Sequence, residues 1–402
     1  MKRLTAALCL AEVLGMVGFA TFPALLPTFQ EGWTLSNTDA GWISGIYLGG
    51  YMVSVPVLSS LTDRVDARRV YAGGILLGGL AALGYALLAE GFWTAMIFRA
   101  IGGVGLAGTY MPGLKILSDH IDGPNQSRFV SVYTANFSIG AGLSYFLAGA
   151  VAGRLGWSAA FVTAALGSLA ALFVVVLAVP PATHHVTTRP VTRLLDFRPV
   201  LRAREAMGYV LGYGAHMWEL FALRSWIVAF LFYSQSLQPA GARVWSATAI
   251  AALIHLLQML ASIAGNELAV RFGRRRALVA VMSASVLLSL GVGFSARLPF
   301  AAVTALVLLY GFVMSLDSAA LTAGALAAAP TGYRGATMAV HSTMGFGMGF
   351  VGSLAVGVVL DMAGATPSLG WGLGFALMGL GCALGPVALM LLARPRTARV
   401  SP

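Results

Sequence analysis

Long apolar stretches alternate with short polar segments along the whole 402-residue chain. Stretches of about 20 apolar residues are typical of membrane-spanning helices, because a helix rises 1.5 Å per residue and the hydrocarbon core is about 30 Å thick. Gly, Pro and charged residues mark where each stretch ends. The pattern predicts twelve transmembrane helices over residues 4–28, 39–62, 69–90, 92–118, 126–153, 157–180, 206–235, 241–269, 275–296, 299–328, 333–361 and 368–393.

Composition supports a polytopic membrane protein. Hydrophobic residues make up 58% of the chain and charged residues 10%, whereas a soluble domain carries about 25% charged residues. The net charge of +11 does not indicate nucleic-acid binding, because the basic residues form short clusters between apolar spans. We therefore expect the lipid bilayer as surroundings and no nucleic-acid partner. The first apolar stretch continues without a clear cleavage site and is interpreted as a span rather than a signal peptide.

The basic residues also predict the orientation. Nineteen of the 25 Lys and Arg lie in the termini and in the connections after every second span, whereas only Arg154, Arg243 and Arg297 lie in the opposite set of connections. The remaining three basic residues lie within spans. Positive residues face the cytoplasm in such proteins, so both termini and the central linker are expected there, in a bacterial inner membrane.

A short basic pattern occurs twice, about half the chain apart. The first copy reads Leu-Thr-Asp-Arg-Val-Asp-Ala-Arg-Arg over residues 61–69, and the second reads Leu-Ala-Val-Arg-Phe-Gly-Arg-Arg-Arg over residues 268–276. Each copy occupies the same place in its half, which is typical of a duplicated transporter architecture. The expected organisation is an N-terminal six-helix bundle (1–181), a cytoplasmic linker (182–205) and a C-terminal six-helix bundle (206–402).

Twelve spans, the 6+6 repeat and these loop motifs resemble the major facilitator superfamily of secondary transporters. In the predicted span 92–118, Arg99 followed by Gly103 is similar to an Arg-x-x-x-Gly pattern of that family. Ser144 and Tyr145 stand where many drug/proton antiporters of the family carry Gly-Pro, and the overall pattern looks closest to the cyanate and nitrate/nitrite porter branches. The resemblance implies an all-α membrane protein with two pseudo-symmetric six-helix bundles that works by alternating access.

The basic loops are candidate gating elements. Asp63 is expected at a cytoplasmic helix end, where a carboxylate accepts charge-assisted hydrogen bonds from an arginine or a helix N-terminus. Such a latch would exist in only one arrangement of the halves. Val270 replaces the acid in the second copy, so the two latches are not equivalent. An alternative is that these arginines only set topology. The candidate gating residues are Asp63, Arg64, Arg68 and Arg271.

Ionisable side chains inside spans are functional candidates, because each costs about 2.5–3.5 kcal/mol at the bilayer centre. The predicted spans contain Glu12, Arg99, Lys115, His216, Glu219, Arg224, His255, Asp317 and His341.

The span 206–235 is the densest polar segment. His216 and Glu219 have an i, i+3 spacing that permits a proton-coupling pair, and Arg224 lies eight residues beyond His216, where it would attract an anionic substrate. His255 falls near mid-depth in the span 241–269 and is a further candidate substrate ligand. The alternative for this group is a structural polar network that joins neighbouring helices.

Several other intramembrane residues carry two interpretations each. The family resemblance implies a role in substrate binding or proton coupling for Arg99; its alternative is an ion pair with Glu12, which the depth of the two residues disfavours. Glu12 is a candidate proton carrier. Asp317 either carries protons, pairs with His341 or packs helices together. The aromatic residues that are candidates for lining a central cavity or for packing are Tyr47, Tyr51, Tyr110, Tyr133, Tyr145 and Trp218.

No motif for an enzyme appears. The chain lacks a phosphate-binding Gly-rich loop with lysine, a nucleophile elbow and metal-ligand spacing, so no cofactor or metal is expected. The sequence predicts a secondary active transporter whose expected cargo is a small anionic solute, moved by coupling to protons or by exchange. The alternative is a proton-coupled exporter of drugs or metabolites with Glu12 or Asp317 as proton carrier. We expect the transporter to be a monomer.

Overall fold

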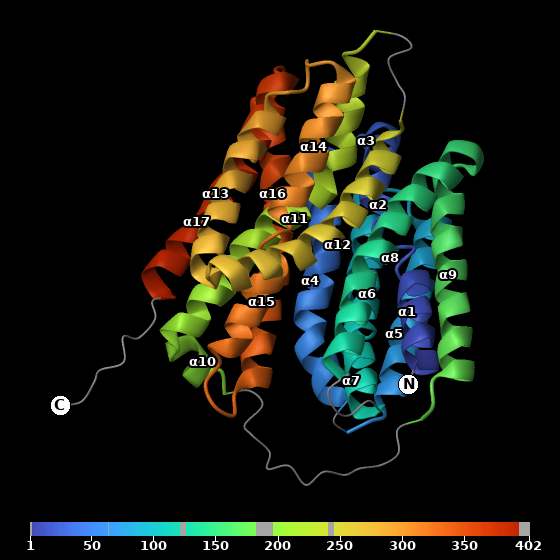
Figure 1. The fold of residues 1–402 in the computed structure, drawn as a ribbon. Coiled ribbons are helices and arrows are strands. Elements are labelled where there is room, and N and C mark those ends of the chain that lie inside the picture. The colour runs from blue at the N-terminus through green and yellow to red at the C-terminus, as the bar shows by residue number, and fades with distance from the viewer. Residues whose placement is uncertain (1, 63, 121–125, 182–195, 240–244, 394–402) are drawn as a thin grey trace, which may run out of the picture.

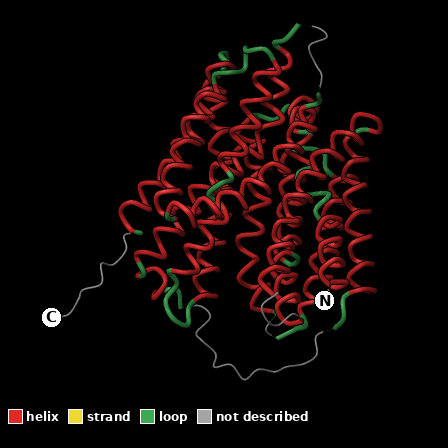
Figure 2. Tube along the Cα trace, viewed as in Figure 1, coloured by secondary structure: helices red, strands yellow, loops and turns green. Residues whose placement is uncertain are grey.

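The computed structural model describes residues 2–62, 64–120, 126–181, 196–239 and 245–393, and all regular structure in this part is helical (Figures 1 and 2). The helices before the linker are α1 (Lys2–Gly15), α2 (Thr21–Ala24), α3 (Leu26–Trp33), α4 (Asn37–Leu61), α5 (Ala67–Leu88), α6 (Phe92–Ala107), α7 (Tyr110–His120), α8 (Gln126–Leu155) and α9 (Trp157–Ala178). The later helices are α10 (Arg198–Arg202), α11 (Arg204–Ser236), α12 (Ala247–Phe272), α13 (Arg274–Gly293), α14 (Phe300–Met314), α15 (Ser318–Ala327), α16 (Arg334–Ala363) and α17 (Pro367–Leu392).

The predicted all-helical class is confirmed for the described residues. Ten helical segments within them are long and apolar enough to cross a membrane, and these correspond to ten of the predicted spans. The other two predicted spans, 4–28 and 92–118, are divided into shorter helices, α1–α2–α3 and α6–α7. The count of twelve therefore stays a prediction.

Helix starts follow from local polar residues. At α4, Ser36 accepts a hydrogen bond from the backbone of Asp39, whose carboxylate accepts from the Ser36 backbone in return. This capping box satisfies donors that a helix N-terminus otherwise leaves unpaired. Asp66 caps α5 and Ser246 caps α12, and each side chain accepts one hydrogen bond from a backbone N–H of the first turn.

Helix interruptions occur inside the bundle, against glycines of neighbouring helices. Residues 315–317 separate α14 from α15, and the Leu316 carbonyl lies so close to Gly265 of α12 that a Cβ there would be 1.6 Å from the oxygen. Gly108, between α6 and α7, packs against Gly74 of α5 in a similar way. The absence of side chains at these positions allows broken backbone to lie within the protein, where other chain segments surround it.

The helices form two groups by their contacts, called here the first half (α1–α9) and the second half (α11–α17). Helices α1–α9 pack mainly with one another, and so do α11–α17; between the groups, α4 packs along α16, α8 along α12, and α11 touches α2, α3 and α4. In Figure 1 the two groups lie close together near the top and diverge towards the bottom, where the N-terminus lies. Residues 182–195 of the predicted linker lie outside the described residues, and α10 occupies 198–202. The domain boundaries themselves remain a prediction.

The contact between α4 and α16 begins at the end where α4 starts. A Cβ at Gly41 would lie 3.0 Å from Leu354 and Ser353, and one at Gly45 would lie 2.5 Å from the Phe350 ring. Closer to mid-helix, Tyr51 stacks on Phe346 with 3.9 Å between ring centroids. The two halves are therefore in tight contact from the start of α4 to about its middle.

Candidate functional site

Arg224 of α11 lies at the junction of the two halves. Its Nη2 donates to Gln258 Oε1 of α12 at 3.1 Å, and its guanidinium carbon lies 5.2 Å from the Phe221 ring centroid. The first half contributes Phe137, with its ring centroid 5.9 Å from the same carbon, and Tyr145, whose hydroxyl donates to the Arg224 carbonyl. The arginine is 8% exposed, so helices of both halves enclose it.

His255 joins this junction from α12. Its Nδ1 lies 2.8 Å from the Ala251 carbonyl, its ring centroid lies 4.9 Å from that of Tyr145, and its Nε2 has no hydrogen-bond partner among the described residues. Gly142 of α8 permits the approach, because a Cβ there would lie 3.4 Å from the His255 Cβ. Two polar side chains that sequence analysis selected, Arg224 and His255, are thus in the same inter-half region.

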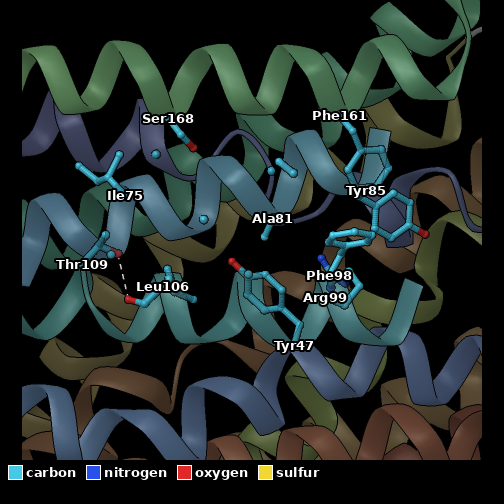
Figure 3. A pocket seen from close by; sticks show the side chains of 17 residues that line it. Tyr47, Ile75, Ala81, Tyr85, Phe98, Arg99, Leu106, Thr109, Phe161 and Ser168 are labelled. Carbon is cyan, nitrogen blue, oxygen red and sulfur yellow. Dashed lines mark hydrogen bonds between the residues drawn. The ribbon is translucent and has the colours of Figure 1, made fainter. Parts of the chain in front are cut away.

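Arg99 of α6 occupies a different place, inside the first half. Its guanidinium lies 4.3 Å from the Tyr47 ring centroid, and its nitrogens donate to the carbonyls of Ile43 and Phe19 at 3.4 and 3.3 Å. A pocket of about 50 Å³ lies between α5, α6 and α9. Figure 3 shows Arg99 near Tyr47 and Tyr85 at one end of it. The Phe19 carbonyl is free to accept because it belongs to the interruption between α1 and α2.

Neither Arg99 nor Arg224 has an acidic partner within the part of the chain that the structure describes. Among the described residues, no carboxylate oxygen lies within 4.0 Å of Arg99 or Arg224. The expected alternative for Arg99, an ion pair with Glu12, is not formed. Carbonyls, an amide and aromatic rings offset part of the cost of burying each cation, but they supply no negative charge. Within the described part of the chain, both cations are therefore buried without a countercharge.

Glu12 of α1 lies in a polar cluster of its own in the first half. Its Oε2 is 3.4 Å from Asn136 Nδ2, while its Oε1 has no hydrogen-bond partner among the described residues. The hydroxyls of Tyr71 and Tyr133 are likewise buried without a hydrogen-bond partner of good geometry among the described residues. Unsatisfied buried polar atoms gathered at one place are chemically suited to receive a proton or water.

The second half pairs its titratable groups differently from the sequence expectation. His216 Nδ1 lies 2.7 Å from Asp317 Oδ1, at ion-pair distance, although the orientation is not that of a hydrogen bond. Both side chains are almost completely buried. Asp317 reaches His216 from the interruption between α14 and α15. The expected His216–Glu219 pair is not formed.

Glu219 instead points into the interior of the second half. Its Oε1 accepts hydrogen bonds from Ser285 of α13 and Tyr310 of α14, both at 2.9 Å, while its Oε2 has no partner among the described residues. This arrangement matches the structural network that sequence analysis left as an alternative. The alternative pair of Asp317 with His341 is not formed among the described residues. His341 of α16 instead stacks on Tyr213, with 3.7 Å between ring centroids, and its Nε2 lies 3.3 Å from the Thr322 hydroxyl.

The candidate aromatic residues divide between the junction and the packing inside each half. Tyr51 stacks across the junction, as described above, and Tyr47 packs on Arg99. Tyr110 stacks on Tyr133 with 6.1 Å between ring centroids. Trp218 donates to the Leu377 carbonyl of α17 at 3.2 Å, within the second half. Its indole also lies against Gly381, where a Cβ would be 2.2 Å from Nε1.

The candidate gating residues show no contact between halves among the described residues. Arg68 donates to the Val176 carbonyl of α9, within its own half. Arg271 lies 3.9 Å from Glu267 on the same helix, with both side chains mostly exposed. Arg64 is exposed, and Asp63 lies outside the described residues. Their gating role stays a prediction.

Sequence reasoning missed Asn136, Gln258, Ser285 and Tyr310 as partners of the buried charges. Uncharged polar residues give no distinctive signal in a single sequence, and their partners lie on other helices. One further acid, Asp361, was missed because it sits at a helix end; its contacts are described below. Its signal was the scarcity of acids, since only 14 Asp and Glu occur in the chain.

Comparison with known proteins identifies relatives named spinster. The chain is 30% identical over 244 residues to protein spinster homolog 1 of Bos taurus, and 26% identical over 242 residues to that of Homo sapiens. Each alignment covers 58% of this chain but 46% of the relative, so the match spans about half the length of these curated relatives. These relatives give no support to the cyanate and nitrate/nitrite branch resemblance.

Solved structures share the fold over nearly the whole chain. A bacterial homologue of the human lysosomal transporter spinster, in an inward-facing and occupied conformation, has a TM-score of 0.75 at 16% identity and covers 97% of this chain and 94% of its own. A D-xylose-proton symporter has a TM-score of 0.77 at 14% identity, with 98% of each chain covered. The family model of the Major Facilitator Superfamily matches residues 8–353. The chain is therefore a multi-pass membrane transporter rather than an enzyme, and it belongs to the Major Facilitator Superfamily.

Proposed function

We propose that this transporter moves a small anionic solute by alternating access, coupled to protons or by exchange. The observation that carries the proposal is the buried guanidinium of Arg224, which lies between the halves without a carboxylate partner among the described residues. A cation in such a place attracts an anion strongly, because water screens it poorly. A site at the junction of two transporter halves is also the place that opens to alternate sides.

His255 and Tyr145 complete the proposed substrate site. His255 Nε2, which has no partner among the described residues, is available to hydrogen-bond a solute, and the Tyr145 hydroxyl donates to the Arg224 carbonyl. Arg99 lies in the first half with its own carbonyl and aromatic partners. Arg99 contributes a second positive charge to the protein interior, which favours anionic over cationic solutes there.

Two groups are suited to coupling with protons. His216 and Asp317 are a close pair of ionisable side chains buried in the second half, 2.7 Å apart. Glu12 has one carboxylate oxygen that finds no hydrogen-bond partner in the described part of the chain. The neighbour named as a D-xylose-proton symporter makes proton coupling chemically reasonable for this fold, while its sugar cargo and the nucleosides of transporter NupG show that the fold does not determine the cargo.

The membrane setting follows from the charge distribution. With nineteen basic residues on one set of segments, we propose a bacterial inner-membrane protein with both termini and the 182–205 linker in the cytoplasm, twelve spans in two bundles, and a monomeric working unit.

Transport by purified protein in liposomes tests the function. A panel of small anions is first screened for thermal stabilisation, since a ligand at 100 times its Kd stabilises by about 2.7 kcal/mol. Uptake of a stabilising anion is then measured with and without an imposed proton gradient. Arg224→Gln should abolish both stabilisation and uptake, whereas Arg154→Gln, which removes an exposed charge, should leave both unchanged. Equal effects of the two substitutions would refute a substrate site at Arg224.

Export of drugs or metabolites is the second candidate. It is favoured by the buried acids Glu12 and Asp317, because an uncharged or cationic cargo would exchange for a proton held on a carboxylate. Susceptibility profiles of cells that lack or overproduce the protein distinguish the two. Resistance that depends on Glu12 and not on Arg224 would favour export.

A further inference from the structure

Asp361, in the last turn of α16, joins the two halves at the end of the bundle where α4 begins; we call this the distal end. Its Oδ1 accepts hydrogen bonds from the backbone N–H and the side-chain amide of Asn37, at 3.0 and 2.8 Å. Its Oδ2 accepts from the backbone N–H and the hydroxyl of Thr38, at 2.7 and 2.6 Å. One carboxylate of the second half therefore receives four hydrogen bonds from the first half.

These bonds complete the N-terminus of α4. Ser36 Oγ accepts from the Asp39 backbone within the first half, at 3.0 Å, but the backbone N–H groups of Asn37 and Thr38 find their acceptor on Asp361. The first N–H groups of a helix have no partner within the helix, and its positive dipole end favours a negative charge. The cap of α4 is thus divided between the two halves of the transporter.

Neighbouring residues position the Asp361 carboxylate next to the N-terminus of α4. Gly357, one turn before Asp361, allows α16 to approach closely, because a Cβ there would lie 2.2 Å from the Asn37 carbonyl oxygen. Gln30 of α3 donates to Asn37 Oδ1 at 2.8 Å, which leaves the Asn37 amide nitrogen directed to Asp361. The contact is therefore positioned from both sides.

Asp361 is unfavourably placed for its own helix. An acid in the last turn meets the negative end of the α16 dipole, where a basic residue would be stabilising. A residue that opposes local preference and gains its partners from another part of the protein is typical of a functional contact. Asp361 has such partners only while the distal ends of the halves are together.

We propose that Asp361 is a distal gating residue, whose carboxylate holds the two halves closed at this end and must release α4 before the substrate site opens there. This inference rests on the alternating-access part of the proposed function, and under the proposed topology the distal end faces away from the cytoplasm. It assigns to Asp361 the control of access to the site, separate from substrate binding at Arg224.

Distances between spin labels on the full chain in lipid nanodiscs test the gate without any substrate. Labels are attached at the exposed distal positions Glu31→Cys and Ala365→Cys, one in each half, after Cys9→Ser and Cys382→Ser. Asp361→Asn should raise the ratio of long to short distances about three- to tenfold, since it removes the charge from a mostly exposed set of hydrogen bonds.

Asp39→Asn is the matched control. Asp39 lies at the same helix end, but among the described residues its carboxylate accepts only from Ser36 of the same half, so its replacement should leave the distances unchanged. Thr38→Ala removes one donor to Asp361 and should give a smaller shift in the same direction, which does not add to that of Asp361→Asn. Thr38→Ala also tests the gate by itself if Asp361→Asn fails to fold.

The gate would be refuted if Asp361→Asn and Thr38→Ala give the distances of the Asp39→Asn control. Because this readout uses neither an anion nor a proton gradient, its outcome is separate from that of the liposome experiment. An opened distal end together with normal anion specificity would support the gate and the substrate site independently. An opened distal end without anion transport would overturn only the proposed cargo.

Discussion

Gly265→Ala should destabilise the second half of the transporter and disturb its buried His216–Asp317 contact. The added Cβ would lie 1.6 Å from the carbonyl oxygen, 2.4 Å from the carbonyl carbon and 2.6 Å from the Cα of Leu316. All three atoms are backbone, so no side-chain rotation relieves the overlap. Leu316 immediately precedes Asp317, and the movement that accommodates the methyl group must shift Asp317 relative to His216.

The magnitude combines two opposing terms. Overpacking against backbone costs about 3 kcal/mol, the upper part of the usual range, while alanine in place of glycine within a helix returns about 1 kcal/mol. We expect a net loss of about 2 kcal/mol in the free energy of unfolding. Gly291→Ala in α13 is the matched control, because nothing lies within 4 Å of the added methyl group. It should gain up to about 1 kcal/mol.

Denaturation in mixed detergent micelles, followed by tryptophan fluorescence, measures both variants. The unfolding midpoint should fall for Gly265→Ala and rise slightly for Gly291→Ala. Midpoints that move in the same direction by a similar amount would refute the packing argument, and with it the view that the α14–α15 interruption is held in place by this glycine.

Two further predictions concern the buried titratable groups. Tyr310→Phe removes one of the two hydrogen-bond donors to Glu219. It should lower the free energy of unfolding by about 1 kcal/mol in the same denaturation assay. An unchanged midpoint would contradict a structural role for Glu219. His216→Gln leaves Asp317 without this partner and should reduce the uptake that an imposed proton gradient drives, whereas His120→Gln, at the end of α7, should leave it unchanged. Unchanged gradient-driven uptake in His216→Gln would exclude the pair from coupling.

The helical spans were predictable because they depend on properties that are local in the chain. An apolar run such as that of α9 or α17 must be helical in a bilayer, where every backbone N–H and C=O needs an internal partner. The buried charges were also predictable, since Arg99, Arg224 and Asp317 stand out among apolar residues. The interruptions in predicted spans 4–28 and 92–118 were not predictable, because tertiary packing rather than a local sequence pattern stabilises them.

Partnerships between charges could not be predicted from spacing along one helix. His216 and Glu219 are three residues apart, but successive residues turn by about 100°, so their side chains diverge by about 60° around the axis. That angle directs His216 to Asp317 and Glu219 to Ser285 and Tyr310. The position of Asp317 depends on the α14–α15 interruption, which has no signal in the sequence pattern.

The predicted cytoplasmic latch and the observed distal contact use the same chemistry at opposite ends of the molecule. Sequence analysis expected a carboxylate, that of Asp63, to bind an arginine or a helix N-terminus near the end of α4. The structure shows the carboxylate of Asp361 bound to the N-terminus of α4 itself. Because α4 packs along α16 from this end to about its middle, rocking the halves apart here must break the Asp361 bonds as the opposite ends approach.

A latch at each end would make the transporter bistable. Each closed end gains hydrogen bonds that the other arrangement lacks, so the difference between the two sets, rather than their sum, fixes the resting population. Asp361→Asn and Asp63→Asn should therefore shift the distal label distances in opposite directions, and the double variant should return close to the unmodified ratio. A double variant that equals Asp361→Asn alone would show that only the distal carboxylate controls the balance.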